Sequence, residues 1–224
     1  EIESFLFPFK VNFPNLQDVM VVDITTQRNS KNDKLEVKKE VKKIGSRISD
    51  DKNTWAISVQ KDSLTIIKYK PYNTFEEIAK QADFFIRQFL DKFKGVIFKK
   101  ISLRYINIFN YLVENSNDFV SDYIGLLPAF TSFNVENTSV LSYSNQVQLV
   151  KENMEALVKI QHVLPENKEQ MLASVALDIT VQQMIEANDY KKVQQIIQDI
   201  EPLRKLKNEI FFSIVLPKTI KKFQ

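Results

Sequence analysis

Residues 55–95 read WAISVQKDSLTIIKYKPYNTFEEIAKQADFFIRQFLDKFKG, and they decide the fold class because a β-hairpin is followed directly by a long helix. In the first arm, Trp55, Ile57 and Val59 alternate with smaller or polar residues, which is typical of a half-buried strand. Lys61 and Asp62 mark a turn, and residues 63–70 form the second arm. A hairpin joined to a helix in this way favours an α+β fold.

The helix has the clearest signals in the chain. Thr74 and Glu77 form a capping box, in which the hydroxyl and the carboxylate each accept a hydrogen bond from a free backbone N–H. Gly95 suits the left-handed conformation that ends a helix. We expect the apolar face to lie in the core, where burying each phenylalanine stabilises the fold by about 2–3 kcal/mol. That face holds, at helical spacing, Phe75, Ile78, Ala79, Ala82, Phe85, Ile86, Phe89, Leu90 and Phe93.

On the N-terminal side of the hairpin, the sequence predicts two further strands. Residues 17–27 are rich in β-branched side chains and follow the turn-like Asn12-Phe13-Pro14-Asn15. Residues 28–54 are polar and rich in lysine, and we expect one exposed strand in them, over residues 35–48.

On the C-terminal side, residues 99–109 form a strand with apolar side chains on both faces, which indicates that both faces are covered. Further strands are predicted at 139–150, 154–164 and 171–180, with a short helix near 116–126. Two helical segments close the chain. Asn188 or Asp189 caps the first, which ends at Ile200, and Pro202 stands in the first turn of the second. The second segment has an apolar face of Leu203, Leu206, Ile210 and Ile214.

These elements predict an α+β fold in which a mostly antiparallel sheet system packs against two long helices. Because no Pro/Gly/Ser-rich linker interrupts the chain, we interpret residues 1–224 as a single domain. Two similar β-rich halves that share a core, at 1–110 and 135–224, remain the alternative.

Several residue types are too scarce for common kinds of active site. The chain has no cysteine, one histidine and three well-separated glycines. Disulfides and thiolate metal sites are therefore excluded, and imidazole triads and zinc sites nearly so. The P-loop and the dinucleotide fingerprint are excluded as well. His162 lies in an apolar strand and is expected to be structural. We expect no catalytic centre, no metal and no cofactor.

Two clusters of positive charge stand out in a chain whose net charge is only +3. Residues 31–43 carry six lysines against three acidic residues. The second cluster comprises Arg204, Lys205, Lys207, Lys218, Lys221 and Lys222. These lysines either cover solvated faces and block pairing at an exposed strand edge, or form a patch for phosphates or an acidic protein partner.

Four polar residues lie inside apolar strands. Tyr105 and Asn107 fall on one face of the strand 101–109 and Arg104 on the other, while Asp178 stands between two aliphatic residues in the strand 171–180. An unpaired buried polar group costs about 1–3 kcal/mol, and a charge costs more. We therefore expect Arg104 to pair with Asp178, or to share a polar network with Tyr105 and Asn107. Such a pair fixes the strand order, or Arg104 recognises an anionic group.

The run Leu103-Arg104-Tyr105-Ile106-Asn107 resembles the marker strand of a sporadically distributed bacterial and archaeal family of uncharacterised proteins, the "LRYIN" family. Features along nearly the whole chain resemble it in the same order: Asn12-Phe13-Pro14, Trp55, Tyr72 with Phe75, Leu177-Asp178-Ile179, and Phe211 with Ser213-Ile214. The chain departs from the pattern at Thr180, where the family has a second acid, and near Lys207 and Asn208, where it has a histidine. The resemblance implies a common fold and a patchy distribution typical of defence-associated genes, and it implies no known reaction.

We expect a soluble, cytoplasmic, non-catalytic protein that binds a protein partner encoded nearby, for instance in a defence or toxin–antitoxin type locus. The first ten residues show no signal-peptide pattern. Two alternatives stay open. One is nucleic-acid binding through the lysines and the aromatics Tyr69, Tyr72 and Tyr143. The other is a small-ligand pocket or enzyme that uses Arg104, Tyr105, Asn107 and Asp178. A homo-oligomer also stays open.

Overall fold

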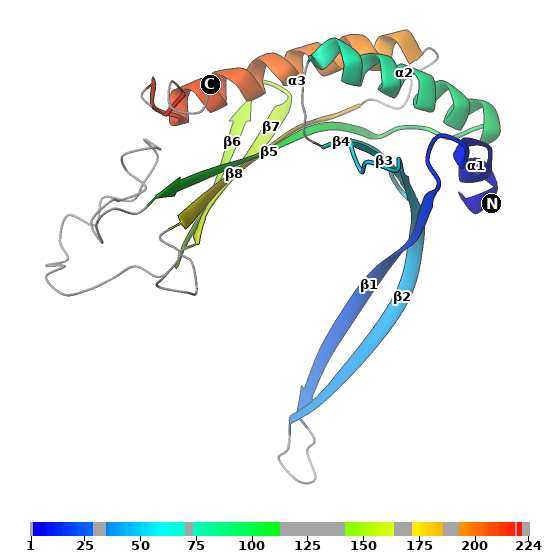
Figure 1. The fold of residues 1–224 in the computed structure, drawn as a ribbon, viewed down its shortest axis with the longest axis horizontal. Coiled ribbons are helices and arrows are strands. Elements are labelled where there is room, and N and C mark those ends of the chain that lie inside the picture. The colour runs from blue at the N-terminus through cyan, green and yellow to red at the C-terminus, as the bar shows by residue number, and fades with distance from the viewer. Residues whose placement is uncertain are drawn as a thin grey trace, which may run out of the picture. The chain divides into compact units, whose positions relative to one another are not determined.

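The computed structural model describes residues 2–28, 35–69, 74–112, 142–163, 172–185, 193–217 and 219–220, and it has the predicted α+β class (Figure 1). The elements in chain order are α1 (Ile2–Leu6), the 3-10 turn η1 (Phe7–Phe9), β1 (Asn15–Arg28), β2 (Leu35–Ser49), β3 (Trp55–Gln60), β4 (Leu64–Lys68), α2 (Phe75–Lys92), β5 (Lys100–Leu112), β6 (Ser142–Lys151), β7 (Met154–Val163), β8 (Leu172–Met184) and α3 (Val193–Ile214). The chain forms two compact units, Glu1–Val96 and Ile97–Gln224. The single-domain interpretation stays a prediction.

The first unit is an antiparallel sheet with the strand order β1-β2-β3-β4. The register places Ile48 beside Ile57 and Ile57 beside Ile66, so that one row of β-branched side chains crosses three strands. Ile48 and Ile57 are fully buried in a cluster with Phe5, Leu6, Val59 and Phe85. The core of this unit therefore joins the sheet to both α1 and α2.

Helix α2 begins as the sequence predicts, since the Thr74 hydroxyl accepts a hydrogen bond from the Glu77 backbone N–H at 3.3 Å. It ends at Lys92 with Phe93 as its C-cap, and Gly95, just beyond the cap, adopts the predicted left-handed conformation with a φ of 83°. Phe85 is fully buried, and its neighbours on the helix pack edge-on against α1: the Phe5 and Phe89 ring centroids are 5.4 Å apart. The phenylalanines of the predicted apolar face are buried or packed against the core, as expected, whereas Phe84, which is not on that face, is 46% exposed.

Strands β1 and β2 are much longer than β3, and they continue as a two-stranded ribbon beyond the four-stranded part of the sheet (Figure 1). The pairing of β2 with β3 stops at Gly45, opposite Gln60. At the same level the register of β1 and β2 shifts between Val19 and Met20, because β2 carries one extra residue. From here on we call residues 20–26 and 37–43 the ribbon. The strand predicted at 35–48 is confirmed as β2, but it is exposed only where it forms the second arm of the ribbon, since Ser46 and Ile48 are buried.

The second unit is an antiparallel sheet with the order β5-β8-β7-β6, covered on one face by α3. Val158, Leu177 and Ile179 are fully buried on that face. They pack in one cluster with the predicted helix residues Leu203, Leu206, Ile210 and Ile214. The strands predicted in this half are confirmed within a few residues.

Two expectations for the second unit are wrong. Strand β5 is not covered on both faces, since Ile106 and Ile108 are more than half exposed. The closing helix is not broken at Pro202, which lies inside α3. A helical proline costs about 3 kcal/mol, but the helix buries residues on both sides of it, Ile196 and Leu203. Burial on both sides of Pro202 thus favours a single helix.

Some predictions fall outside the described residues. They are the short helix near 116–126 and the cap at Asn188 or Asp189. Among the helices in the described ranges, none is both long and apolar enough to span a membrane.

Replacing Gly45 with alanine should destabilise the first unit, because the new Cβ would lie 2.3 Å from the Val59 carbonyl oxygen, and the backbone would have to move. We expect a loss of about 1–3 kcal/mol in the free energy of unfolding, measured by denaturant titration. Gly95→Ala is the control, since its Cβ would meet no atom within 4 Å and only the positive φ opposes it. If Gly45→Ala were as stable as the wild-type protein, the close approach of residue 45 to the Val59 carbonyl would not constrain the backbone at the base of the ribbon.

Candidate functional site

The predicted pairing of Arg104 with Asp178 is confirmed. Arg104 donates from Nε to Asp178 Oδ1 at 2.9 Å and from Nη2 to Oδ2 at 2.6 Å. The two side chains thus form a bidentate ion pair between the neighbouring strands β5 and β8. The hydrogen bonds that Arg104 donates to the carboxylate raise the pKa of Arg104 above its usual value. The pair is not buried as expected, because the Arg104 side chain is 59% exposed. It lies on the face of the sheet opposite to α3, where water solvates the guanidinium.

Tyr105 and Asn107 do not join this pair, because they lie on the other face of β5. The Tyr105 ring instead lies under Lys207 of α3, whose Nζ is 3.9 Å from the ring centroid. Burial, together with repulsion from Arg204, lowers the pKa of Lys207 to about 8. Arg104 and Asp178 therefore form a charged pair on one face of the sheet, whereas Tyr105 and Asn107 lie on the face that α3 covers.

The other predicted residues are only partly described. The backbone of His162 pairs with Val175 in the sheet, and its side chain lies outside the described residues, as do those of Tyr72 and Tyr143. Tyr69 accepts a hydrogen bond from Arg47, whose guanidinium lies 5.5 Å from the ring centroid. Tyr69 is thus already covered on one side by a side chain of its own unit.

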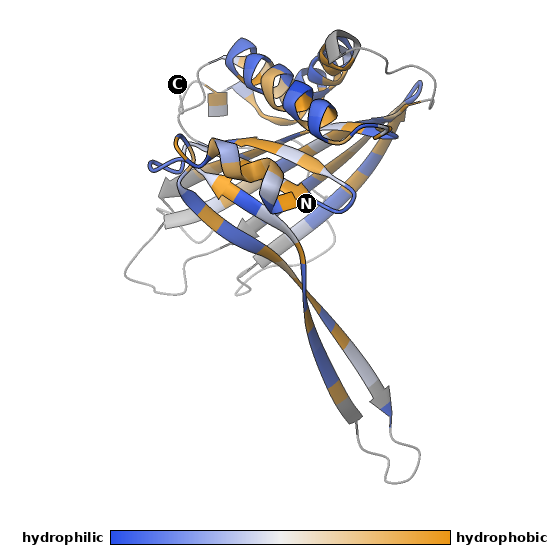
Figure 2. Ribbon diagram, turned by 90° about the vertical axis from the view of Figure 1, so that its right-hand side faces the viewer, coloured by the Kyte–Doolittle hydropathy of each residue, from blue (hydrophilic) through white to orange (hydrophobic). Residues whose placement is uncertain are grey.

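The ribbon has two unlike faces, and sequence reasoning missed them. Residues directly opposite in an antiparallel ladder project to the same side, and the register pairs Val22 with Val41, Ile24 with Lys39 and Thr26 with Val37. Five aliphatic side chains on this side are between 47% and 66% exposed: Met20, Val22, Ile24, Val37 and Val41. Figure 2 shows apolar and polar residues alternating along both strands. We call this side the apolar face.

The net positive charge of the ribbon lies on the apolar face. Its two cations are Lys39 and Lys43, and its described residues include no carboxylate. The opposite face is balanced, with Lys38 and Lys42 against Asp23 and Glu40, and the Lys42 and Glu40 charges are 3.1 Å apart.

At the base of the ribbon, Lys43 is held by Glu3 at 2.6 Å and by Asp18 at 2.7 Å, and these contacts raise its pKa. Lys39 has no carboxylate partner among the described residues. It is therefore the one cation of the apolar face that its own unit leaves uncompensated in the described ranges.

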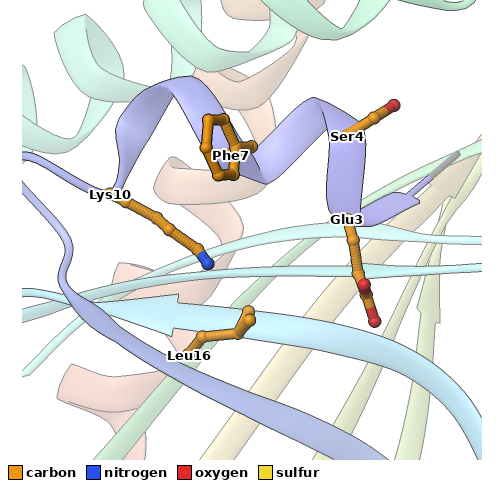
Figure 3. Close-up of a pocket in the computed structure, with 5 residues that line it drawn as sticks. All are labelled: Glu3, Ser4, Phe7, Lys10 and Leu16. Atoms are coloured by element: carbon orange, nitrogen blue, oxygen red, sulfur yellow. The ribbon is translucent and has the colours of Figure 1, made fainter.

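A surface cavity of about 340 Å³ adjoins the base of the apolar face. It is lined by Glu3, Ser4, Phe7, Lys10 and Leu16, and in Figure 3 the Lys10 side chain extends between the Phe7 ring and Leu16. Every second residue of β1 from Leu16 to Ile24 lies on one side of the strand, so Leu16 continues the row of Met20 and Val22. Phe7 adds an aromatic ring that is 67% exposed. The cavity thus lies on the same side of β1 as the apolar face.

Comparisons of the chain with models of protein families, with curated proteins and with solved structures found no significant match. In the described part of the chain, no three acidic or histidine side chains gather as metal ligands would.

A double-mutant cycle of Arg104→Met and Asp178→Asn should give a coupling energy below about 1 kcal/mol, because the guanidinium is exposed to water. Urea unfolding of the four proteins measures it. A coupling of several kcal/mol would contradict the exposed geometry, since only a buried pair loses that much when one partner is removed.

Replacing Lys207 with methionine should raise the melting temperature near pH 7, where the folded chain must hold a half-buried charge. The pKa of Lys207 is lowered from its ordinary 10.5 to about 8 in the folded chain. The unfolded chain therefore binds more protons between those pH values, and the wild-type protein gains stability as the pH rises through them. The difference between variant and wild type should shrink from pH 7 to pH 10. Lys205→Met, at an exposed position two residues away, is the control, and a difference that does not vary with pH would contradict this account.

Proposed function

We propose that this chain is a non-catalytic binding protein that engages a protein partner through the apolar face of the ribbon. The observation that carries the proposal is the exposure of five aliphatic side chains on one side of an element with only two strands. A two-stranded hairpin is marginally stable by itself in water. An apolar surface maintained on such an element is typical of an interaction site.

The chemistry of the apolar face favours a protein over a nucleic acid. Aliphatic side chains offer no ring for base stacking, and the opposite face of the ribbon has balanced charges. A ligand pocket built on Arg104 and Asp178 has less support, because the two charges neutralise each other. The resemblance to the LRYIN family is in keeping with a partner from a defence or toxin–antitoxin type locus.

Capture experiments with two neighbouring ribbon variants test the proposal. Ile24 and Thr25 are both exposed and project to opposite faces, so Ile24→Asp and Thr25→Asp add the same charge to different sides. Immobilised wild type and Thr25→Asp should enrich the same protein from a lysate of the source organism, and Ile24→Asp should not, as measured by quantitative mass spectrometry. Circular dichroism checks that both variants fold.

Enrichment that survives Ile24→Asp, or no protein enriched above background, would refute the proposal. Recovery of nucleic acid that is released by raising the salt concentration would support the alternative function instead.

A further inference from the structure

We infer that the partner adds a strand to the open edge of β1 and places a carboxylate beside Lys39. This inference rests on the proposed function and specifies the chemistry of the partner. In the sheet order β1-β2-β3-β4, β1 is an edge strand along its whole length, so one side of its backbone is not paired in the described sheet. Exposed edges of this kind are the places where extended segments of other proteins pair.

The two free edges of the ribbon differ in how they are protected. The second arm carries Lys38, Lys39, Lys42 and Lys43, and lysine is a common means of blocking an edge against pairing. Strand β1 has the sequence NLQDVMVVDITTQR, without lysine or proline, and its centre is β-branched. Only the edge of β1 therefore retains the chemistry of a strand that accepts a neighbour.

Side-chain contact with the apolar face alone contributes too little binding free energy for association. These five aliphatic side chains are already about half covered within the ribbon. Their remaining burial is small beside the loss of translational and rotational freedom on association. A third strand supplies backbone hydrogen bonds along β1, and it turns a marginal two-stranded element into a three-stranded one.

The register predicts the side chains that such a strand should carry. Lys39 lies opposite Ile24 and Lys43 lies opposite Met20, with Val22 and Val41 between them. An added strand places its residues beside Ile24, Val22 and Met20 on the same side, and a lysine side chain can reach across one strand. The complementary pattern is acidic–x–apolar–x–acidic. The position beside Ile24 matters most, because Lys43 already binds Glu3 and Asp18.

A second copy of this chain fits the edge less well. The carboxylates of its own β1 are Asp18, which already binds Lys43, and Asp23, which projects to the opposite face. Neither is available to Lys39 without breaking an existing contact or turning the strand over.

Two synthetic peptides test the inference. STETVTETS carries the predicted pattern in either chain direction, and STKTVTKTS is the same peptide with lysine in place of glutamate. Titration into the ¹⁵N-labelled full chain should shift the NMR signals of β1, with an affinity for the acidic peptide that is about tenfold higher. Backbone amides in β1 that exchange rapidly in the free protein should become protected by the acidic peptide.

Charge reversal provides the matched control. Lys39→Glu should reverse the preference between the peptides, and Lys38→Glu, the same change on the opposite face, should leave it unchanged. Equal affinity for the two peptides, absence of binding, or binding without protection of β1 amides overturns strand addition. A dimer of the free chain with these amides already protected identifies a second copy as the occupant and overturns it as well. The capture experiment with Ile24→Asp does not depend on these outcomes, so a failure of the inference and a failure of the proposed function can be told apart.

Discussion

The backbone pairing of β1 with β2 continues past the last residue that β3 supports, and the apolar face exists because of that continuation. A hydrogen-bonded ladder can hold two strands together, but two strands provide no second layer against which side chains can be buried. The aliphatic residues of the ribbon therefore stay in water, although the same residue types are fully buried a few positions away at Ile48 and Ile57. The extra residue in β2 and the close approach at Gly45 mark the point where the change occurs.

The second unit shows how an equivalent alternation is completed when a cover is present. Helix α3 lies on one face of the β5–β8 sheet, and the aliphatic residues of β7 and β8 on that face, among them Val158, Leu177 and Ile179, are fully buried. On the outer face, Arg104 and Asp178 satisfy each other across two adjacent strands. Charged groups in an apolar strand are thus accounted for by structure in this unit, whereas Lys39 in the ribbon has no carboxylate partner in the described ranges. This contrast directs attention to the first unit as the binding part.

Local signals in the sequence predicted most of the elements. The hairpin from Trp55, the Thr74 cap and the pair Arg104–Asp178 were all accessible from periodicity, capping chemistry and the cost of burying a charge. The exposed face of β5 and the unbroken helix α3 could not be predicted. Both depend on which helix packs on which face of the sheet, and the hydrophobic pattern of a single segment does not contain that information. The apolar face was missed for a related reason. Each arm of the ribbon alternates visibly, but only the register shows that Val22, Ile24, Val37 and Val41 share a side with Lys39.

The chain contains no cysteine, so single introduced cysteines can report whether the apolar face is open in the free protein and covered in the complex. The most direct measurement is the rate of thiol labelling of Ile24→Cys and Thr25→Cys, in the purified protein and in the presence of the captured partner. Both thiols should be labelled rapidly in the free protein, and Ile24→Cys alone should be labelled slowly once the partner is bound. Slow labelling of Ile24→Cys in the free protein, or equal labelling of both thiols in the complex, would show that the partner does not bind at the apolar face.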